Sequence, residues 1–229
     1  MPADRKDEPV VLSRIYTRTG DAGSTALGDG SRVDKNDPRL VAYADVDEAN
    51  CAIGTALALG QLDGEMAALL TRIQNEMFDV GADLCNPVTP DPKYPPLRVD
   101  DSYVADLERA CDEHNEDLPT LRSFVLPGGT PGAALLHTAR TVVRRAERSA
   151  WAAHAAHPDS VNPAAARYLN RLSDLLFILA RKANGERGPD RAVGLVHVGV
   201  GDQARIGLGH PAHVAERGGP VVAGTGVDT

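Results

Sequence analysis

Long segments with apolar residues at helical spacing, several of them opened by a helix-start signal, constrain the fold of this chain most strongly. Asp37-Pro38 and Asn162-Pro163 each combine a capping side chain with a proline, whose missing N–H costs nothing at the first helical position. Val46, Ile53 and Leu57 then recur at the spacing of a helix. The same analysis predicts helices over residues 37–59, 64–84, 101–114, 131–154 and 162–184. No strand hairpin or βαβ pattern competes with these segments, so we expect an all-α fold, an up-and-down bundle of five helices.

The two ends of the chain differ in composition from this helical part. Residues 1–13 are polar, and we expect them to be loose. The segment from residue 185 onward contains 11 of the 22 glycines and no Phe, Trp or Tyr. Its alternation of valine and glycine is compatible with a short strand, but a mobile appendage is the favoured interpretation. We therefore predict a flexible segment at 1–13, a helical domain at 14–184 and a glycine-rich tail at 185–229.

The composition excludes several classes of protein. The chain has 24 Lys and Arg against 32 Asp and Glu, a net charge of −8, which argues against a general nucleic-acid binder. No apolar run approaches the ~20 residues that span a bilayer, so no membrane segment is expected. Three cysteines lie far apart, and their odd number makes a disulfide framework unfavourable. These features indicate a reduced, cytoplasmic protein, and only 4% aromatic residues means that aliphatic side chains and alanine must form its core.

A loop rich in glycine and hydroxyl groups at residues 17–35 is the first candidate site. Small residues let backbone N–H groups approach a phosphate, hydroxyl side chains donate hydrogen bonds, and Arg18 and Lys35 supply positive charge. The loop is not a Walker A motif, because no Gly-Lys-Ser/Thr opens the following helix. A plain surface loop is an equally good interpretation from composition alone. The hydroxyl donors are Thr17, Thr19, Ser24 and Thr25.

The predicted helix at 131–154 carries a dense group of arginines. Spacings of four and then three residues place Arg140, Arg144 and Glu147 on one face. Arginines on a rigid helix can clamp a triphosphate and stabilise charge as it leaves. For a bare run of charges a solvated basic face is the better interpretation. The acidic balance of the whole chain nevertheless makes this cluster, which includes Arg145 and Arg148, a local exception.

Two further polar groups lie in the first and last predicted helices. Asn170 and Asp174 are one turn apart and face the same way, either into solvent or into a hydrogen-bonded site. Asp47 is by default a solvated carboxylate, although it could pair with an arginine of another helix or another subunit. His137 is more simply a core or surface histidine than a ligand.

Taken together and in order, these segments resemble the PduO-type ATP:cob(I)alamin (corrinoid) adenosyltransferases. The match runs from about residue 15 to residue 184, and the glycine-rich tail departs from the usual ending of the family. The motifs that carry it are Tyr16 to Asp21, Ala42 to Glu48, Phe124 to Gly129, Arg144 to Arg148 and Leu169 to Asp174. The resemblance implies a ferritin-like five-helix bundle assembled as a homotrimer, with active sites between neighbouring subunits.

The resemblance also implies a reaction: transfer of the 5′-deoxyadenosyl group of ATP to reduced cobalamin, with Co(II) first reduced to Co(I), triphosphate released and Mg²⁺ on the phosphates. A reductase and an adenosylcobalamin-dependent acceptor enzyme are its implied partners. By matching position, Asp47 and Arg140 would join adjacent subunits, and Phe124 would face the corrinoid with Asp174 nearby. The residues implied to contact the nucleotide are Thr17, Arg18, Thr19, Gly20, Thr25, Lys35, Arg144, Arg145, Glu147, Arg148 and Asn170. The alternatives are a non-catalytic ATP- or corrinoid-binding carrier or sensor, and a purely structural bundle.

Overall fold

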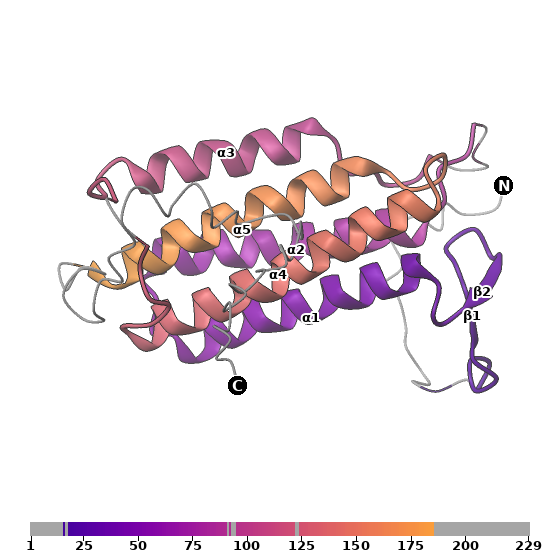
Figure 1. The fold of residues 1–229 in the computed structure, drawn as a ribbon, viewed down its shortest axis with the longest axis horizontal. Coiled ribbons are helices and arrows are strands. Elements are labelled where there is room, and N and C mark those ends of the chain that lie inside the picture. The colour runs from indigo at the N-terminus through magenta and orange to yellow at the C-terminus, as the bar shows by residue number, and fades with distance from the viewer. Residues whose placement is uncertain (1–15, 17, 91, 93–94, 122–123, 186–229) are drawn as a thin grey trace, which may run out of the picture.

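The computed structural model describes residues 16, 18–90, 92, 95–121 and 124–185. The described part is a bundle of five helices with a two-stranded ladder at one end (Figure 1). The expected five-helix fold is therefore confirmed, and each helix boundary lies within two residues of its predicted position. The elements are β1 (Ser24–Ala26), β2 (Arg32–Asp34), α1 (Pro38–Leu59), α2 (Gly64–Cys85), α3 (Asp101–Asn115), α4 (Pro131–Ala156) and α5 (Pro163–Ala183).

The helices begin where the sequence supplies a capping side chain. The carboxylate of Asp37 accepts a hydrogen bond from the backbone N–H of Arg39 at 2.8 Å. The side-chain oxygen of Asn162 accepts one from the N–H of Ala164 at 3.0 Å. Each cap satisfies an N–H group that has no partner inside its helix, so the predicted starts of α1 and α5 have a clear physical cause.

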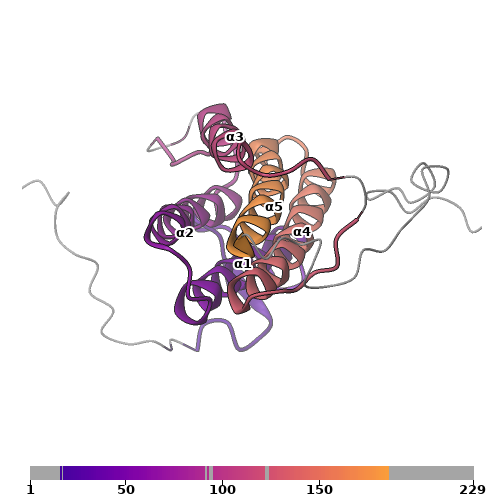
Figure 2. The ribbon, with the colours of Figure 1, turned by 90° about the vertical axis from the view of Figure 1, so that its left-hand side faces the viewer.

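The core is aliphatic and rich in alanine, as the low aromatic content predicts. Leu169, Leu172, Leu176 and Leu179 of α5 are completely buried. In the end-on view α5 lies between α3, α2, α1 and α4 (Figure 2), which explains why this helix buries so many large side chains. Small residues serve the contact between α1 and α4, where the fully buried alanines include Ala42, Ala49, Ala139 and Ala146.

A buried ion pair holds the proline-rich connection between α2 and α3. The carboxylate of Asp83 is fully shielded from solvent and lies 2.5 Å from the guanidinium of Arg98. It also accepts hydrogen bonds from the N–H of Val99 at 2.8 Å and from the side chain of Asn162 at 2.6 Å. These partners of the Asp83 carboxylate all come from the chain itself, so the network has a structural role.

The expectation that residues 17–35 form a loop without strands is wrong at one point. Ser24–Ala26 and Arg32–Asp34 pair as an antiparallel ladder in which Thr25 faces Val33. Three residues on each side are too few to show an alternating apolar pattern, so the sequence carried no signal for them. The N–H of Gly28, in the turn between the strands, donates to the carbonyl of Cys85 at 3.0 Å and ties this ladder to the end of α2.

The expected division of the chain into three parts stays a prediction. Residues 1–13 lie outside the described part of the structure, and so does the tail after Gly185.

Candidate functional site

The N-terminal loop, residues 16–35, is organised around the side chain of Arg32. Its guanidinium donates hydrogen bonds to the carbonyl of Thr19 at 2.9 Å and to the carbonyl and hydroxyl of Ser24 at 3.1 and 2.7 Å. Three acceptors on one guanidinium draw the two sides of the loop together. Arg32 therefore shapes the loop, a role that the sequence analysis did not predict.

Lys35 lies against the backbone of Gly20. A methyl group added at Gly20 would lie 3.0 Å from the ammonium nitrogen of Lys35, so glycine leaves room for this cation. Arg18 is exposed, has a left-handed φ of +62° and lies with its guanidinium 5.9 Å from the ring centre of Tyr16. Among the other predicted loop residues, Thr19 is exposed, Thr25 is half-buried in β1, and Thr17 lies outside the described residues.

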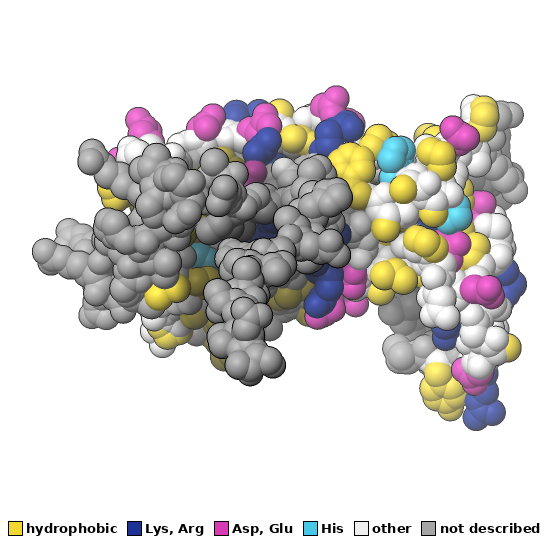
Figure 3. Space-filling model, in the orientation of Figure 1, with side chains coloured by type: hydrophobic (Ala, Val, Ile, Leu, Met, Phe, Trp, Pro, Cys, Tyr) yellow, Lys and Arg dark blue, Asp and Glu magenta, His cyan; other side chains and the backbone are white. Residues whose placement is uncertain are grey.

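The structure places the predicted groups of α4 and α5 side by side. The side-chain amide of Asn170 donates to the carboxylate of Glu147 at 3.0 Å and links the two helices. Arg144 is half-buried, and its carbonyl accepts a hydrogen bond at 3.0 Å from the exposed guanidinium of Arg148. We call the surface formed by Arg140, Arg144, Glu147 and Arg148 the α4 face. In Figure 3 basic and acidic side chains lie close together over the middle of the bundle.

Arg145 has a different environment from the rest of the arginine group. Its guanidinium forms an ion pair with Glu48 of α1 and lies 3.7 Å from Asp45. The hydrogen bond to Glu48 raises the pKa of Arg145 above its ordinary value. Asp45 in turn accepts a hydrogen bond from Ser149 at 2.5 Å. In this arrangement Arg145 joins α4 to α1, and its charge is already balanced within the chain.

Asp174 is likewise paired, with a cation of its own helix. The guanidinium of Arg171 donates to Asp174 at 2.6 Å and to Glu108 of α3 at 3.2 Å. Asp174 is exposed on α5 one turn after Asn170. It therefore lies next to the α4 face on the α5 side, and its charge is shared with Arg171.

A cluster of the buried His137 and the half-buried Phe177 lies beside the α4 face. The ring of Phe177 is 5.9 Å from the ring of His137 and 5.9 Å from the guanidinium of Arg140. His137 is only 4% exposed, and burial, followed by the charge of Arg140, lowers its pKa. Burial, followed by the charge of Arg144, also lowers the pKa of Arg140. Two nitrogens of this cluster, His137 Nδ1 and Arg140 Nε, are buried with no hydrogen-bond partner among the described residues.

Sequence reasoning did not single out Phe177, although its position three residues after Asp174 on α5 offered a signal. Asn184 was also missed. It accepts a hydrogen bond from the N–H of Thr130 at 2.9 Å and donates to the carbonyl of Gly128 at 3.1 Å. An added methyl group at Gly129 would overlap the Asn184 oxygen at 2.1 Å. This contact fixes the turn that follows the half-buried Phe124 and leads into α4.

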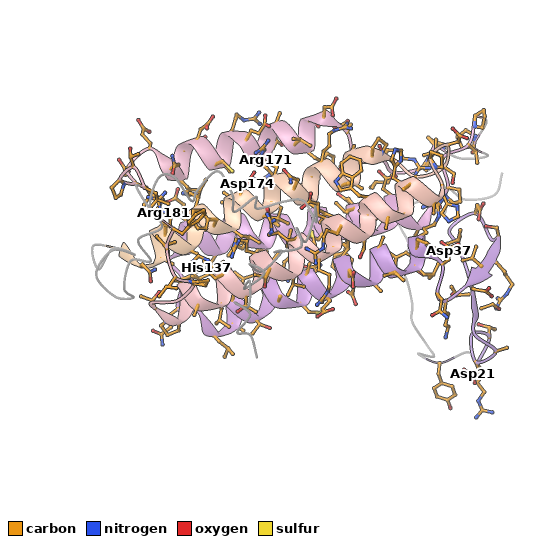
Figure 4. The ribbon with its side chains drawn as sticks, in the orientation of Figure 1. Asp21, Asp37, His137, Arg171, Asp174 and Arg181 are labelled. Carbon is orange, nitrogen blue, oxygen red and sulfur yellow. The ribbon has the colours of Figure 1, made fainter. Side chains whose placement is uncertain are left out.

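The predicted site residues do not all meet within one chain. Figure 4 shows Asp21, in the N-terminal loop, beyond the end of the bundle where α1 begins, whereas His137 and Asp174 lie over its middle and opposite half. Asp47 is exposed and borders a groove between α1 and α2, away from Arg140 on α4. The pairing of Asp47 with Arg140 therefore is not formed inside a single chain.

None of the described helices combines the length and apolar character needed to cross a lipid bilayer. Within the described residues, no three or more His, Cys, Asp or Glu side chains gather as a metal-binding group.

Comparison with known proteins links this geometry to one family. The family model described as cobalamin adenosyltransferase matches residues 15–183. The corrinoid adenosyltransferase of Mycobacterium tuberculosis is 65% identical over 175 residues, which cover 76% of this chain and 91% of that protein. The corrinoid adenosyltransferase of Bacillus subtilis is 41% identical over 180 residues, covering 76% and 89%.

Solved structures agree with the sequence comparison. A variant PduO-type ATP:corrinoid adenosyltransferase from Lactobacillus reuteri, complexed with cobalamin and ATP, superposes with a TM-score of 0.69 at 34% identity. The alignment covers 79% of this chain and 99% of the Lactobacillus protein. By sequence and by fold, this chain belongs to the cobalamin adenosyltransferase family.

Proposed function

We propose that this protein is an ATP:corrinoid adenosyltransferase, which transfers the 5′-deoxyadenosyl group of ATP to the cobalt of a reduced corrinoid. The observation that carries the proposal is the α4 face, where cations and the Glu147–Asn170 pair lie beside the half-buried Arg140 and Phe177. A polyphosphate fits the cations, and a flat apolar macrocycle fits the aromatic cluster. Membership of the family, and the cobalamin and ATP bound to the relative from Lactobacillus reuteri, support both assignments.

The chemistry explains why the site needs no nucleophilic Ser or Cys and no general base. Co(I) attacks the 5′ carbon of the ribose with its own electron pair, so a cobalt–carbon bond forms as the carbon–oxygen bond to the triphosphate breaks. Cobalt ends as alkyl-Co(III), and the triphosphate leaves with the bonding electrons. The protein has two tasks: to align cobalt with carbon and to stabilise the charge that develops on the triphosphate.

We assign roles to individual residues from their positions in the family motifs and in the structure. Arg144 and Arg148 would contact the phosphates from α4, and Lys35 and the backbone of Gly20 would do so from the N-terminal loop. Phe124 would lie against the corrin ring, with Asp174 at its edge. The remaining proposed nucleotide contacts are Thr17, Arg18, Thr19, Thr25, Arg145, Glu147 and Asn170.

We propose that a second copy of the chain completes the site and that the protein assembles as a homotrimer. The N-terminal loop and the α4 face lie in different parts of one protomer (Figure 4). In an assembly with rotational symmetry, the loop of one copy can reach the α4 face of the next. Asp47 of one protomer would then pair with Arg140 of its neighbour, which gives the half-buried Arg140 guanidinium an anionic partner.

Mg²⁺ is proposed as a companion of ATP. This ion is usually held by substrate phosphates and water with only one or two carboxylates. The Glu147 carboxylate, set among Arg140, Arg144 and Arg148, suits that arrangement. When bound, the ion would neutralise charge on the phosphates, while the arginines supply the fixed positive field around them.

Formation of Co(I) is the harder part of the reaction. We propose that Phe124 occupies the lower axial position of the corrinoid, because loss of an axial ligand makes Co(II) easier to reduce. A reductase would supply the electron, and an adenosylcobalamin-dependent enzyme would accept the product. We also propose a cytoplasmic location, with which the free Cys51, Cys85 and Cys111 agree.

The decisive experiment mixes the full-length protein anaerobically with ATP, Mg²⁺ and chemically reduced cobalamin. The corrinoid absorption spectrum is followed, and released triphosphate is measured on the same samples. We expect adenosylcobalamin and triphosphate to appear in equal amounts. Tight binding of ATP or adenosylcobalamin without triphosphate release would instead identify a carrier, and neither binding nor turnover would reject the proposal.

A further inference from the structure

The loop tip, residues 18–24 of the N-terminal loop, extends past the helices, so its shape has to come from the loop itself. In Figure 4 Asp21 lies beyond the end of the bundle. The N–H of Asp21 donates to the carbonyl of Arg18 at 3.4 Å, and the N–H of Gly23 donates to the carbonyl of Gly20 at 3.2 Å. Both distances are longer than the usual ~2.9–3.0 Å. These two turns therefore hold the loop tip only weakly.

The side chain of Arg32 makes shorter bonds to the same segment. One nitrogen of its guanidinium, Nη2, donates to the carbonyl of Thr19 at 2.9 Å and to the carbonyl and hydroxyl of Ser24 at 3.1 and 2.7 Å. A terminal guanidinium nitrogen carries two N–H groups, so three acceptors use the donor capacity of Nη2 completely. Because Thr19 and Ser24 lie near the two ends of the loop tip, these bonds fix its width.

The bond to Thr19 also sets the direction of the next N–H group. The described residues contain no cis peptide bond, and in a planar trans peptide the C=O and N–H groups point in opposite directions. Since the carbonyl of Thr19 points toward Arg32, the N–H of Gly20 points away from it. This N–H has no hydrogen-bond acceptor in the described part of the chain. It is therefore open to an oxygen atom from outside the protein.

A cation lies at the same glycine. A methyl group added at Gly20 would lie 3.0 Å from the Nζ of Lys35 and 3.2 Å from its ε carbon, so the ammonium group packs against the backbone there. The N–H of Lys35 donates to the carbonyl of Gly23 at 2.9 Å, which ties Lys35 to the loop tip. An open backbone N–H beside an ammonium group suits a phosphate oxygen.

We propose that Arg32 is a positioning residue for ATP. By holding the carbonyls of Thr19 and Ser24, it keeps the N–H of Gly20 open beside the ammonium of Lys35 for a phosphate oxygen. The inference rests on the proposed function, which assigns Gly20 and Lys35 to the nucleotide. A loop that already has its bound shape loses less conformational entropy when ATP arrives. Arg32 therefore acts on the affinity for ATP and not on the chemical step.

Arg32→Ala tests this effect on affinity. We expect the dissociation constant and the Michaelis constant for ATP to rise about tenfold, and the turnover number at saturating ATP to stay within about threefold of the wild type. Titration calorimetry gives the first constant, and steady-state kinetics gives the other two. A wild-type dissociation constant in Arg32→Ala, or a loss confined to turnover, would overturn the proposal.

Ser31→Ala is the matched control within the same loop. It removes the hydrogen bond that the Ser31 hydroxyl donates to the carboxylate of Asp29 at 2.6 Å, in the turn between β1 and β2. The bond from the backbone N–H of Ser31 to the same carboxylate, at 2.9 Å, stays in place. We expect Ser31→Ala to bind ATP as the wild type does. A loss equal to that of Arg32→Ala would show that any loosening of the loop weakens binding, and the specific role of Arg32 would be wrong.

A double-substitution cycle with Ser24 separates positioning from direct contact with ATP. The hydroxyl of Ser24 is one of the three acceptors of Arg32, so Ser24→Ala should weaken ATP binding by about threefold. The double variant Ser24→Ala/Arg32→Ala should bind ATP no more weakly than Arg32→Ala, because the two side chains act through one interaction. If the two losses multiply, each side chain contacts ATP by itself, and the proposal is overturned.

Hydrogen exchange reports on the shape of the loop without any ligand. Mass spectrometry of peptides that cover residues 19–27 compares the wild type with Arg32→Ala. We expect this segment to exchange about tenfold faster in the variant, because its bonds open more often, and the helices to exchange at wild-type rates. Equal exchange in the two proteins would show that the loop keeps its shape without Arg32, which contradicts the proposal.

These measurements also separate the role of Arg32 from the proposed function. If the wild type transfers the adenosyl group and Arg32→Ala has the same constants for ATP, the inference fails and the proposed function stands. If the wild type transfers no adenosyl group, the proposed function fails, while ATP binding and hydrogen exchange still decide the role of Arg32.

Discussion

The N-terminal loop and the α4 face both present cations that we assign to ATP, but they hold these cations in different surroundings. Arg18 and Lys35 of the loop are exposed to solvent. Arg140 and Arg144 of α4 are half-buried, and desolvation together with mutual repulsion lowers the pKa of Arg140. The loop cations are therefore screened by water, whereas the α4 cations act in a medium of lower dielectric constant.

The two regions also differ in how they are supported. The loop is shaped by Arg32 and a ladder of three residues per strand, and is tied to α2 through Gly28. The α4 face is part of a long helix that packs against α1 and α5. Rigid, partly desolvated charges are suited to the transition state, since they need not reorganise as the triphosphate leaves. Exposed groups on a short loop are better suited to closing over bound ATP.

Removal of a cation from the α4 face should have the largest effect. We expect Arg144→Ala to lower the turnover number by about 10²- to 10³-fold, the usual loss when a preorganised donor to a developing anion is removed. The rate of adenosylcobalamin formation at saturating ATP and Co(I) measures it. Arg109→Ala, at an exposed arginine of α3 that pairs with Asp106, serves as the control. A wild-type turnover number for Arg144→Ala would refute the role of the α4 face.

Removal of a loop cation should act mainly on binding. Lys35→Ala should raise the Michaelis constant for ATP by about tenfold to a hundredfold, because a hydrogen bond to a charged group contributes ~1.5–3 kcal/mol. The turnover number should change much less, and Lys35→Arg should recover most of the affinity. Steady-state kinetics with varied ATP separates the two constants. If Lys35→Ala lowers only the turnover number, the loop cation acts in the transition state as the α4 cations do, and the proposed difference between the two regions is wrong.

Phe124 allows the corrinoid side of the site to be tested apart from the nucleotide side. Phe124→Ala should slow the route that starts from Co(II) by about tenfold more than the route that starts from pre-formed Co(I), since only the first needs a displaced axial ligand. Both routes are measured on one preparation, with a chemical reductant in excess for the second. Equal losses on the two routes would show that Phe124 only shapes the pocket.

Helices could be predicted from this sequence because their signals are local. Asp37 and Asn162 cap helices within two residues of themselves, and the leucines of α5 repeat with the period of the helix. The strands β1 and β2 were not predicted, because three residues are too few to show an alternation of apolar and polar side chains. Asn184 escaped because its partners Gly128 and Thr130 lie more than fifty residues earlier in the chain, and no local pattern encodes such a contact.

Sequence analysis proposed the site as a set of residues, and it left their arrangement in space open. The sequence placed Glu147 and Asn170 on two consecutive predicted helices, and the structure joins their side chains at 3.0 Å. It gave no sign that Arg145 pairs with Glu48. The residue type alone does not show whether an arginine side chain contacts a ligand or a neighbouring carboxylate. It also could not show that the loop and the α4 face lie apart in one protomer.

The smallest predicted effect is a pH dependence of the free energy of unfolding that comes from His137 of α4. Burial lowers the pKa of His137 below the ordinary value of 6.5, so the unfolded chain binds a proton more readily than the folded one. The contribution of His137 is therefore fully present above about pH 6.5 and is lost as the pH falls toward the folded pKa. His137→Gln should narrow the gap between the melting temperatures at about pH 7.5 and about pH 5.5 by a few degrees at most. His154→Gln, a half-buried histidine that hydrogen-bonds the carbonyl of Val161, is the control. If His137→Gln keeps the wild-type difference between the two melting temperatures, burial of His137 does not affect the stability of the protein. One difference between the α4 face and the loop would then be removed.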